Sequence, residues 1–163
     1  MKGSKKINLE SIELHISVDK VIDWSTNLEY KLPKDIFTKA NRMSVRAPFE
    51  ESKDLKVSVR VAPLEDVLIM KLMTERTRDH FDAIAITLDS FEKVNAKRFW
   101  SSSKQSNLDQ HIRKRLNSFL ADLRKGLVKK LWKEFTGREF IREQEVTLKE
   151  RINRLLEGTN VKP

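Results

Sequence analysis

The sequence predicts an α+β protein in which a small, mostly antiparallel sheet with packed helices is followed by a helical carboxy-terminal region. Three observations support this fold class. First, apolar and polar residues alternate before residue 61, as in β-strands. Second, a proline follows this alternation, and the apolar residues after it recur at helical spacing. Third, apolar residues beyond residue 107 recur every three to four positions, as in helices. With 163 residues, of which 39% are hydrophobic, the chain is long enough for one sizeable core.

The chain is expected to contain two regions joined by a short linker. Residues 1–100 form the predicted α+β unit, and residues 108–163 form a basic helical region. Residues 101–107, with the sequence SSSKQSN, are the predicted linker because they are the only low-complexity stretch.

The first predicted strand covers Ile12 to Val18, where apolar residues alternate with Glu13, His15 and Ser17. Residues 21–24 form a short apolar piece that either continues this strand or makes a second one.

Residues 27–33 are expected to form a loop, and residues 35–40 a short helix or turn that carries Phe37 and Ala40 inward. Two further strands are predicted over residues 43–46 and 55–61, with a polar turn between them.

The helical part begins at Pro63, because proline ends a strand and is tolerated at a helix start. Leu64, Leu68 and Leu72 recur at helical spacing, and Asp79 is predicted to cap a second helix. Residues 91–100 continue as helix or loop. The remaining predictions are one long helix over 108–135, or two broken near Gly126, a stop at Gly137, and a last helix over 145–156 ended by Gly158.

The composition excludes several kinds of protein and site. Without cysteine the chain has neither disulfides nor thiolate metal sites, and His15, His80 and His111 show no ligand spacing, so no metal site is predicted. No P-loop, dinucleotide-binding turn or hydrolase elbow occurs. Because no apolar run approaches the ~20 residues of a membrane span and nothing resembles a secretory signal, a cytoplasmic protein without membrane contact is expected.

Positive charge is concentrated towards the carboxyl end. Residues 101–163 hold 15 Lys and Arg against 8 Asp and Glu, whereas residues 1–100 hold 18 against 16. Clustered basic side chains can contact the phosphates of a polyanion such as RNA. The candidate nucleic-acid-binding residues are Arg113, Lys114, Arg115, Arg124, Lys125, Lys129, Lys130 and Lys133.

The same helices allow a second interpretation of this face. The basic residues alternate with apolar residues at helical spacing, which indicates helix packing rather than stacking on bases. These apolar residues are Phe119, Leu123, Leu127, Leu131 and Trp132. A solvated surface therefore explains the charges equally well, and the apolar stripe would also suit a homo-oligomer formed through the carboxy-terminal helices.

Residues 61–82, with the sequence VAPLEDVLIMKLMTERTRDHFD, resemble the carboxy-terminal part of the nucleotidyltransferase-fold superfamily. The similarity covers about residues 10–90. It is greatest to small prokaryotic members that include the minimal nucleotidyltransferases and the toxins of abortive-infection systems. The positions that match the family pattern are Glu65, Asp66, Lys71, Arg78, Asp79 and Asp82.

The chain departs from the family at the acidic half of the active site. Active members carry a Gly-Ser turn, a D-x-D or D-x-E pair on a strand and a third carboxylate on a later strand, which together hold two metal ions. This chain has no such pair on a predicted strand, and Glu13 occupies a place similar to the third carboxylate. The resemblance thus implies an incomplete catalytic domain.

By resemblance, Glu13, Lys71 and Asp79 are the candidate catalytic residues. In the family such a lysine approaches the phosphates of the nucleotide or substrate. A structural explanation is open for each of them: Lys71 can pair with Asp79 or Asp82, Asp79 can cap a helix, and Glu13 can be a solvent-facing strand residue.

The leading hypothesis is a degenerate, non-catalytic nucleotidyltransferase-like protein that binds RNA or a partner protein. The alternative is a metal-dependent nucleotidyltransferase acting on RNA, whose missing carboxylates come from another chain or an upstream segment. Only that alternative implies Mg²⁺ and a nucleoside triphosphate as cofactors. A purely structural oligomerisation protein is the third possibility.

Overall fold

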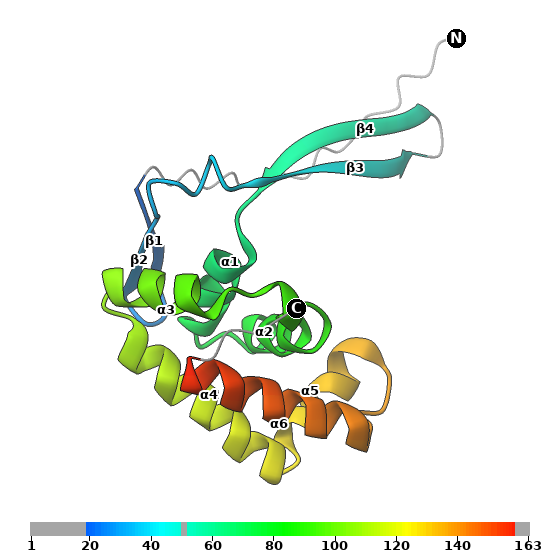
Figure 1. Ribbon diagram of the computed structural model, residues 1–163. Coiled ribbons are helices and arrows are strands. Elements are labelled where there is room, and N and C mark those ends of the chain that lie inside the picture. Colours follow the sequence, from blue (N-terminus) through cyan, green and yellow to red (C-terminus); the bar gives the residue numbers. More distant parts are fainter. Residues whose placement is uncertain (1–18, 50–51, 159–163) are drawn as a thin grey trace.

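The computed structural model describes residues 19–49 and 52–158, and it confirms the α+β class with a helical carboxy-terminal region (Figure 1). The predicted strand at residues 12–18 lies outside the described residues. The described elements are β1 (Lys20–Asp23), β2 (Leu28–Lys31), β3 (Asn41–Phe49), β4 (Ser52–Val61), α1 (Leu64–Leu72), α2 (Thr77–Asp89), the 3₁₀ turn η1 (Phe91–Lys93), α3 (Ala96–Gln105), α4 (Asp109–Arg124), α5 (Leu127–Thr136) and α6 (Arg142–Glu157).

The strands pair as two separate antiparallel ribbons, β1 with β2 and β3 with β4. The β1 strand matches the short apolar piece at 21–24, but the prediction of a loop over 27–33 was wrong, because β2 lies there. Asn27, with φ of 58°, reverses the chain, and Tyr30 is the buried anchor of β2. A four-residue strand with one buried side chain has too short a pattern to be recognised from sequence.

The turn before β3 has the opposite orientation to the one predicted. Residues 35–39 form a turn in which Ile36 is buried while Phe37 is 62% exposed. Ala40 is half-buried. Since Ile36 and Phe37 are adjacent and both apolar, the sequence alone did not show which of them faces the core.

Pro63 precedes α1, as predicted, but Asp79 does not cap α2. The cap position of α2 is Arg76, whose side chain makes no capping hydrogen bond, and Asp79 lies inside the first helical turn. Its carboxylate is 4% exposed and is engaged by side chains from both helices, described below. A carboxylate in the first turn still complements the helix dipole.

The serine-rich segment predicted as a linker is largely helical. Residues 101–105 complete α3, Ser102 and Ser103 are buried, and the Ser103 hydroxyl donates a hydrogen bond to the Phe99 carbonyl at 2.7 Å. Asn107, with φ of 57°, turns the chain into α4. Whether the chain forms two separate regions stays a prediction.

Residues 108–135 were predicted to form either one long helix or two helices, and the structure has two, α4 and α5. Gly126, with φ of 72°, separates α4 from α5, and Gly137, with φ of 67°, ends α5. The last helix begins three residues earlier than predicted, at Arg142, and ends at Gly158.

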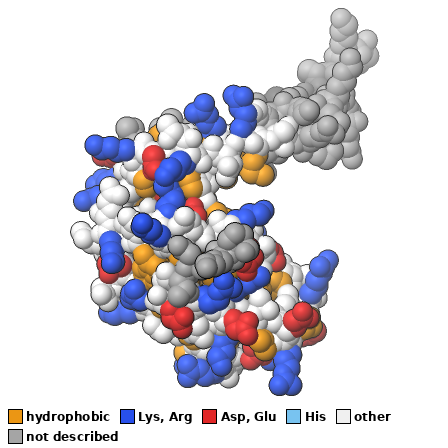
Figure 2. Space-filling view, in the orientation of Figure 1, with side chains coloured by type: hydrophobic (Ala, Val, Ile, Leu, Met, Phe, Trp, Pro, Cys, Tyr) orange, Lys and Arg blue, Asp and Glu red, His pale blue; other side chains and the backbone are white. Residues whose placement is uncertain are grey.

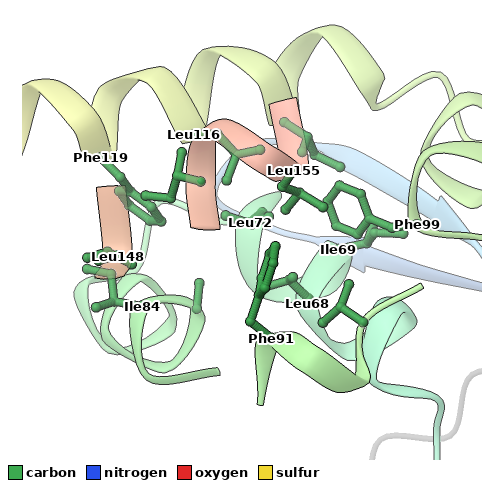
Figure 3. Packing of buried hydrophobic residues seen from close by; sticks show 14 of the residues in the cluster. Leu68, Ile69, Leu72, Ile84, Phe91, Phe99, Leu116, Phe119, Leu148 and Leu155 are labelled. Atoms are coloured by element: carbon green, nitrogen blue, oxygen red, sulfur yellow. The ribbon is translucent and has the colours of Figure 1, made fainter. Parts of the chain in front are cut away.

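The core lies where α4 and α6 pack over α1 and α2 (Figure 3). The core cluster includes Leu68 and Leu72 of α1, Leu116 of α4 and Leu148 of α6, each at most 1% exposed. Residues from both sides of the predicted linker therefore share one hydrophobic cluster.

Candidate functional site

Lys71 of α1 lies among three acidic and polar side chains of the following segment. Its ammonium nitrogen is 2.5 Å from Oδ1 of Asp79 and 2.8 Å from Oδ2 of Asp82. The second oxygen of Asp79 is 2.6 Å from Nε of Arg76 and accepts a hydrogen bond from the Thr74 hydroxyl at 3.1 Å. Lys71 thus contacts both Asp79 and Asp82, which is the pairing that the structural explanation of these residues expects, and a catalytic role stays a prediction.

Both charged partners are held in their ionised forms. Burial, the largest influence on Asp79, disfavours its charge, but the hydrogen bond and charge of Lys71, with help from Thr74 and Arg76, outweigh burial and lower the pKa below 3.8. Burial likewise opposes the charge of Lys71, yet Asp79 and Asp82 raise its pKa above 10.5. The pair therefore joins the end of α1 to the start of α2 as a fixed ion pair, and neither group is poised to exchange a proton near neutral pH.

Glu13 and His15 lie outside the described residues, so their position relative to Lys71 is untested. Among residues 19–49 and 52–158, no group of three or more His, Asp or Glu side chains is arranged to hold a metal ion. His80 lies 3.1 Å from the Thr74 carbonyl and packs edge-on against Phe119. Burial, followed by the charge of Arg115, lowers the pKa of His111, so this imidazole is neutral at pH 7.

A second, buried polar network was not foreseen from the sequence. Asp66, 0% exposed, accepts hydrogen bonds from the Tyr30 hydroxyl at 2.5 Å and from Nη2 of Arg98 at 2.8 Å. Arg98 also donates hydrogen bonds to both carboxylate oxygens of Asp35, at 3.0 and 3.3 Å. The Glu65 carboxylate accepts a hydrogen bond from the backbone N–H of Asn95 at 2.7 Å. Arg98 therefore connects α1 and the segment before β3 to α3, and Asp66 connects β2 to the same network through Tyr30.

One signal in the sequence points to this network. Asp66 precedes the apolar residues Ile69 and Met73 by three and seven positions, so it shares their buried helix face. A carboxylate on such a face requires a cationic or hydroxyl partner. The partner itself, Arg98, could not be identified, because it lies 32 positions away in the chain.

The network borders a pocket of about 390 Å³. Burial, followed by the hydrogen bond to Asp66, raises the pKa of Tyr30, so the hydroxyl stays protonated and keeps donating. Asp35, Asn95 and Arg98 line the pocket wall and are already bonded to one another or to the backbone. The network therefore serves to hold the β1–β2 ribbon and α3 against α1.

The eight candidate basic residues have three different environments. Arg113 and Arg115 are half-buried and have partners within the helical body. The guanidinium of Arg113 lies 4.2 Å from the ring centre of Trp100 and donates to the Leu156 carbonyl at 2.9 Å. The Arg115 side chain is 12% exposed and pairs with Glu75. These two residues are structural.

Lys129 and Lys133 form exposed ion pairs, with Glu145 at 2.8 Å and with Glu139 at 2.5 Å. The remaining four residues are exposed and form no ion pair with any described residue: Lys114, Arg124, Lys125 and Lys130. We call these four the α4–α5 basic surface. Lys114 and Lys125 are eleven positions apart, which returns them to within about 20° of the same side of α4.

On the face of the helical body seen in Figure 2, acidic side chains lie between the basic ones. Four of the eight candidate residues form hydrogen bonds or ion pairs with described residues, so the eight do not share one environment, and their role in binding nucleic acid stays a prediction. Of the eight candidate residues, the four of the α4–α5 basic surface form no ion pair with a described residue.

Comparison with known proteins gives no match to a family model, a curated protein or a solved structure. The resemblance to nucleotidyltransferases therefore stays a prediction, and the site has to be judged by its geometry. None of the described helices combines the length and apolar character that a membrane crossing requires.

Proposed function

We propose that the chain acts by binding rather than catalysis, and that it binds RNA through the α4–α5 basic surface. One observation carries the proposal: Lys114, Arg124, Lys125 and Lys130 are exposed and lack a carboxylate partner among the described residues. The other sides of the same helices carry Leu116, Val128 and other core residues, so the charges are fixed to rigid elements.

Unpaired cations on rigid helices suit a phosphate backbone. Each lysine or arginine that neutralises a phosphate releases condensed counterions, which gives affinity without reading sequence. The described segment that connects the two helices contains no acid: Arg124, Lys125 and Gly126 lead directly into α5, whose first turn has no acidic residue. A polyanion would meet little repulsion there.

The arrangement of the lysine site supports binding over catalysis. The resemblance assigns Lys71 to the approach of nucleotide phosphates, but its ammonium already contacts Asp79 and Asp82. A phosphate could reach it only by displacing two carboxylates, one of them 4% exposed. This supports a scaffold role for the residues that match the family pattern, in a protein that is degenerate with respect to nucleotide transfer.

The binding proposal is tested with labelled bulk tRNA and fluorescence anisotropy. The variant Lys125→Glu/Lys130→Glu should bind on the order of tenfold more weakly, because two favourable contacts with phosphate are lost and the new negative charges repel the phosphates. The matched control Lys34→Glu/Lys104→Glu makes the same change in net charge at two exposed, unpaired lysines elsewhere and should bind nearly as well as wild type. Equal weakening in both variants would contradict the assignment of the surface.

A transfer assay separates binding from catalysis. The chain is incubated with Mg²⁺, labelled nucleoside triphosphates and bulk tRNA, and no incorporation is expected. Metal-dependent incorporation that disappears in Glu13→Gln and Lys71→Met would replace the proposal with a nucleotidyltransferase acting on RNA.

A further inference from the structure

The β3–β4 hairpin projects away from the helical body as an arm (Figure 1). Its two strands pair with each other, and within the described residues neither makes a substantial contact with a helix or with the β1–β2 ribbon. An isolated two-stranded ribbon is marginally stable in water, so an arm of this length is expected to have a role outside its own stability.

The two faces of the arm differ in chemistry. Met43 and Val59 are opposite each other and are 52% and 37% exposed, so they lie on an apolar face. Their strand neighbours Arg42 and Arg60 are also directly opposite each other, and alternation places them on the other face. Both arginines are exposed.

The strand register repeats the basic pair. Four positions along the ribbon from the Arg42–Arg60 pair, the backbone pairs Arg46 with Lys56, and Ser44 and Ser58 are opposite each other in between. Besides these four basic residues, the described strands β3 and β4 hold Lys53 and one acidic residue, Asp54, near the start of β4. The two basic pairs are spaced by about 14 Å along the arm, at ~3.4 Å per residue.

Like charges directly opposite each other destabilise an antiparallel pair. Neither Arg42 nor Arg60 forms an ion pair with a described residue that would offset this repulsion. A bound polyanion would remove the repulsion, and the planar guanidinium of arginine is well matched to a phosphate group.

We propose that the basic face of the β3–β4 arm is a second RNA contact, which binds the phosphate backbone independently of the α4–α5 basic surface. This inference extends the proposed function, since it assumes the same class of ligand. It places that contact on a different element, so the two surfaces can be tested separately. The arm contributes affinity but does not read bases, because its contacts are with phosphates.

The competing explanation is that the arginines protect an unpaired sheet edge from association with other chains. The test variant is therefore Arg42→Gln/Arg60→Gln, which removes the charge without reversing it. Because like-charge repulsion is removed, the urea midpoint should be unchanged or higher, and a folded variant is expected.

Binding of bulk tRNA is measured for wild type, Arg42→Gln/Arg60→Gln, Lys125→Glu/Lys130→Glu and the combination of all four changes. The arm variant should bind roughly three- to tenfold more weakly than wild type, and the two effects should add in the combination, since distant sites act independently. If only the arm variant is weakened, the arm inference stands and the assignment to α4–α5 fails. Unchanged tRNA affinity of the arm variant, with or without increased aggregation, would overturn the inference.

Discussion

Asp66 is a fully buried charge, and Arg98 and Tyr30 together satisfy it. A buried carboxylate with a complete set of partners adds little net stability, but loss of the partner that compensates a buried charge is expensive. Charged residues with buried partners, such as Asp66, therefore stabilise the fold, whereas exposed charged residues without such partners can bind a ligand.

Replacing Asp66 by alanine should lower the free energy of unfolding by about 3–5 kcal/mol, because the Arg98 side chain, 16% exposed, would lose its most buried partner. Urea denaturation measures the change. Asp35→Ala is the matched control: it removes a more exposed carboxylate partner of the same arginine, 39% exposed, and should cost much less. Equal losses would contradict the structural role of Asp66.

Asp79 should make the free energy of unfolding depend on pH in the acidic range. Its pKa in the folded protein is lower than its usual 3.8, so it stabilises the fold fully above that value and less as the pH falls through the folded pKa. Urea midpoints of wild type and Asp79→Asn should differ by the same amount at pH 7 and pH 5 and should approach each other at pH 3. Asp89→Asn, which changes an exposed aspartate, serves as the control. A gap that persists at pH 3 would argue against this ion pair.

At the residue scale, the sequence indicated the Lys71–Asp79 pair, because both residues flank one short connection. It could not show that Arg113 and Arg115 are structural. Their partners, Leu156 and Glu75, are 43 and 40 positions away, and a basic residue on a helix has the same local pattern whether its side chain points to solvent or to a distant carbonyl.

At the element scale, helix ends follow from local chemistry. Gly126 and Gly137 adopt left-handed φ values that most side chains avoid. The stop at Gly137 was predicted from sequence, whereas a break near Gly126 was one of two alternatives. The β2 strand was missed because its pairing with β1 and the burial of Tyr30 are tertiary. Short strands depend on partners that local sequence does not reveal.

Gly126→Ala should cost about 1 kcal/mol of stability, since the left-handed conformation disfavours a Cβ although no atom lies within 4 Å of it. Gly126→Asn should cost less, because asparagine tolerates this conformation. Thermal or urea unfolding compares the two variants. A loss in Gly126→Asn equal to or larger than that in Gly126→Ala would show that crowding, and not backbone strain, governs this position.

At the scale of the whole molecule, a single hydrophobic cluster joins residues from before and after the predicted linker. Ser103, within that segment, is fully buried. Unfolding should therefore be one cooperative transition, and tryptophan fluorescence and far-ultraviolet circular dichroism should give the same urea midpoint. Two separate midpoints would instead favour two independently folding regions.

The function proposed for the whole molecule is binding of a phosphate backbone by exposed cations that form no ion pair with a described residue, on the helical body and on the β arm. The most direct test is the salt dependence of tRNA binding by the wild-type protein. The four cations of the α4–α5 basic surface should contribute about −3 to −4 to the slope of log affinity against log salt concentration, and contacts of the β3–β4 arm should make the wild-type slope steeper still. Lys125→Glu/Lys130→Glu should reduce its magnitude by about two. A wild-type slope near zero, or no binding at low salt, would contradict the account.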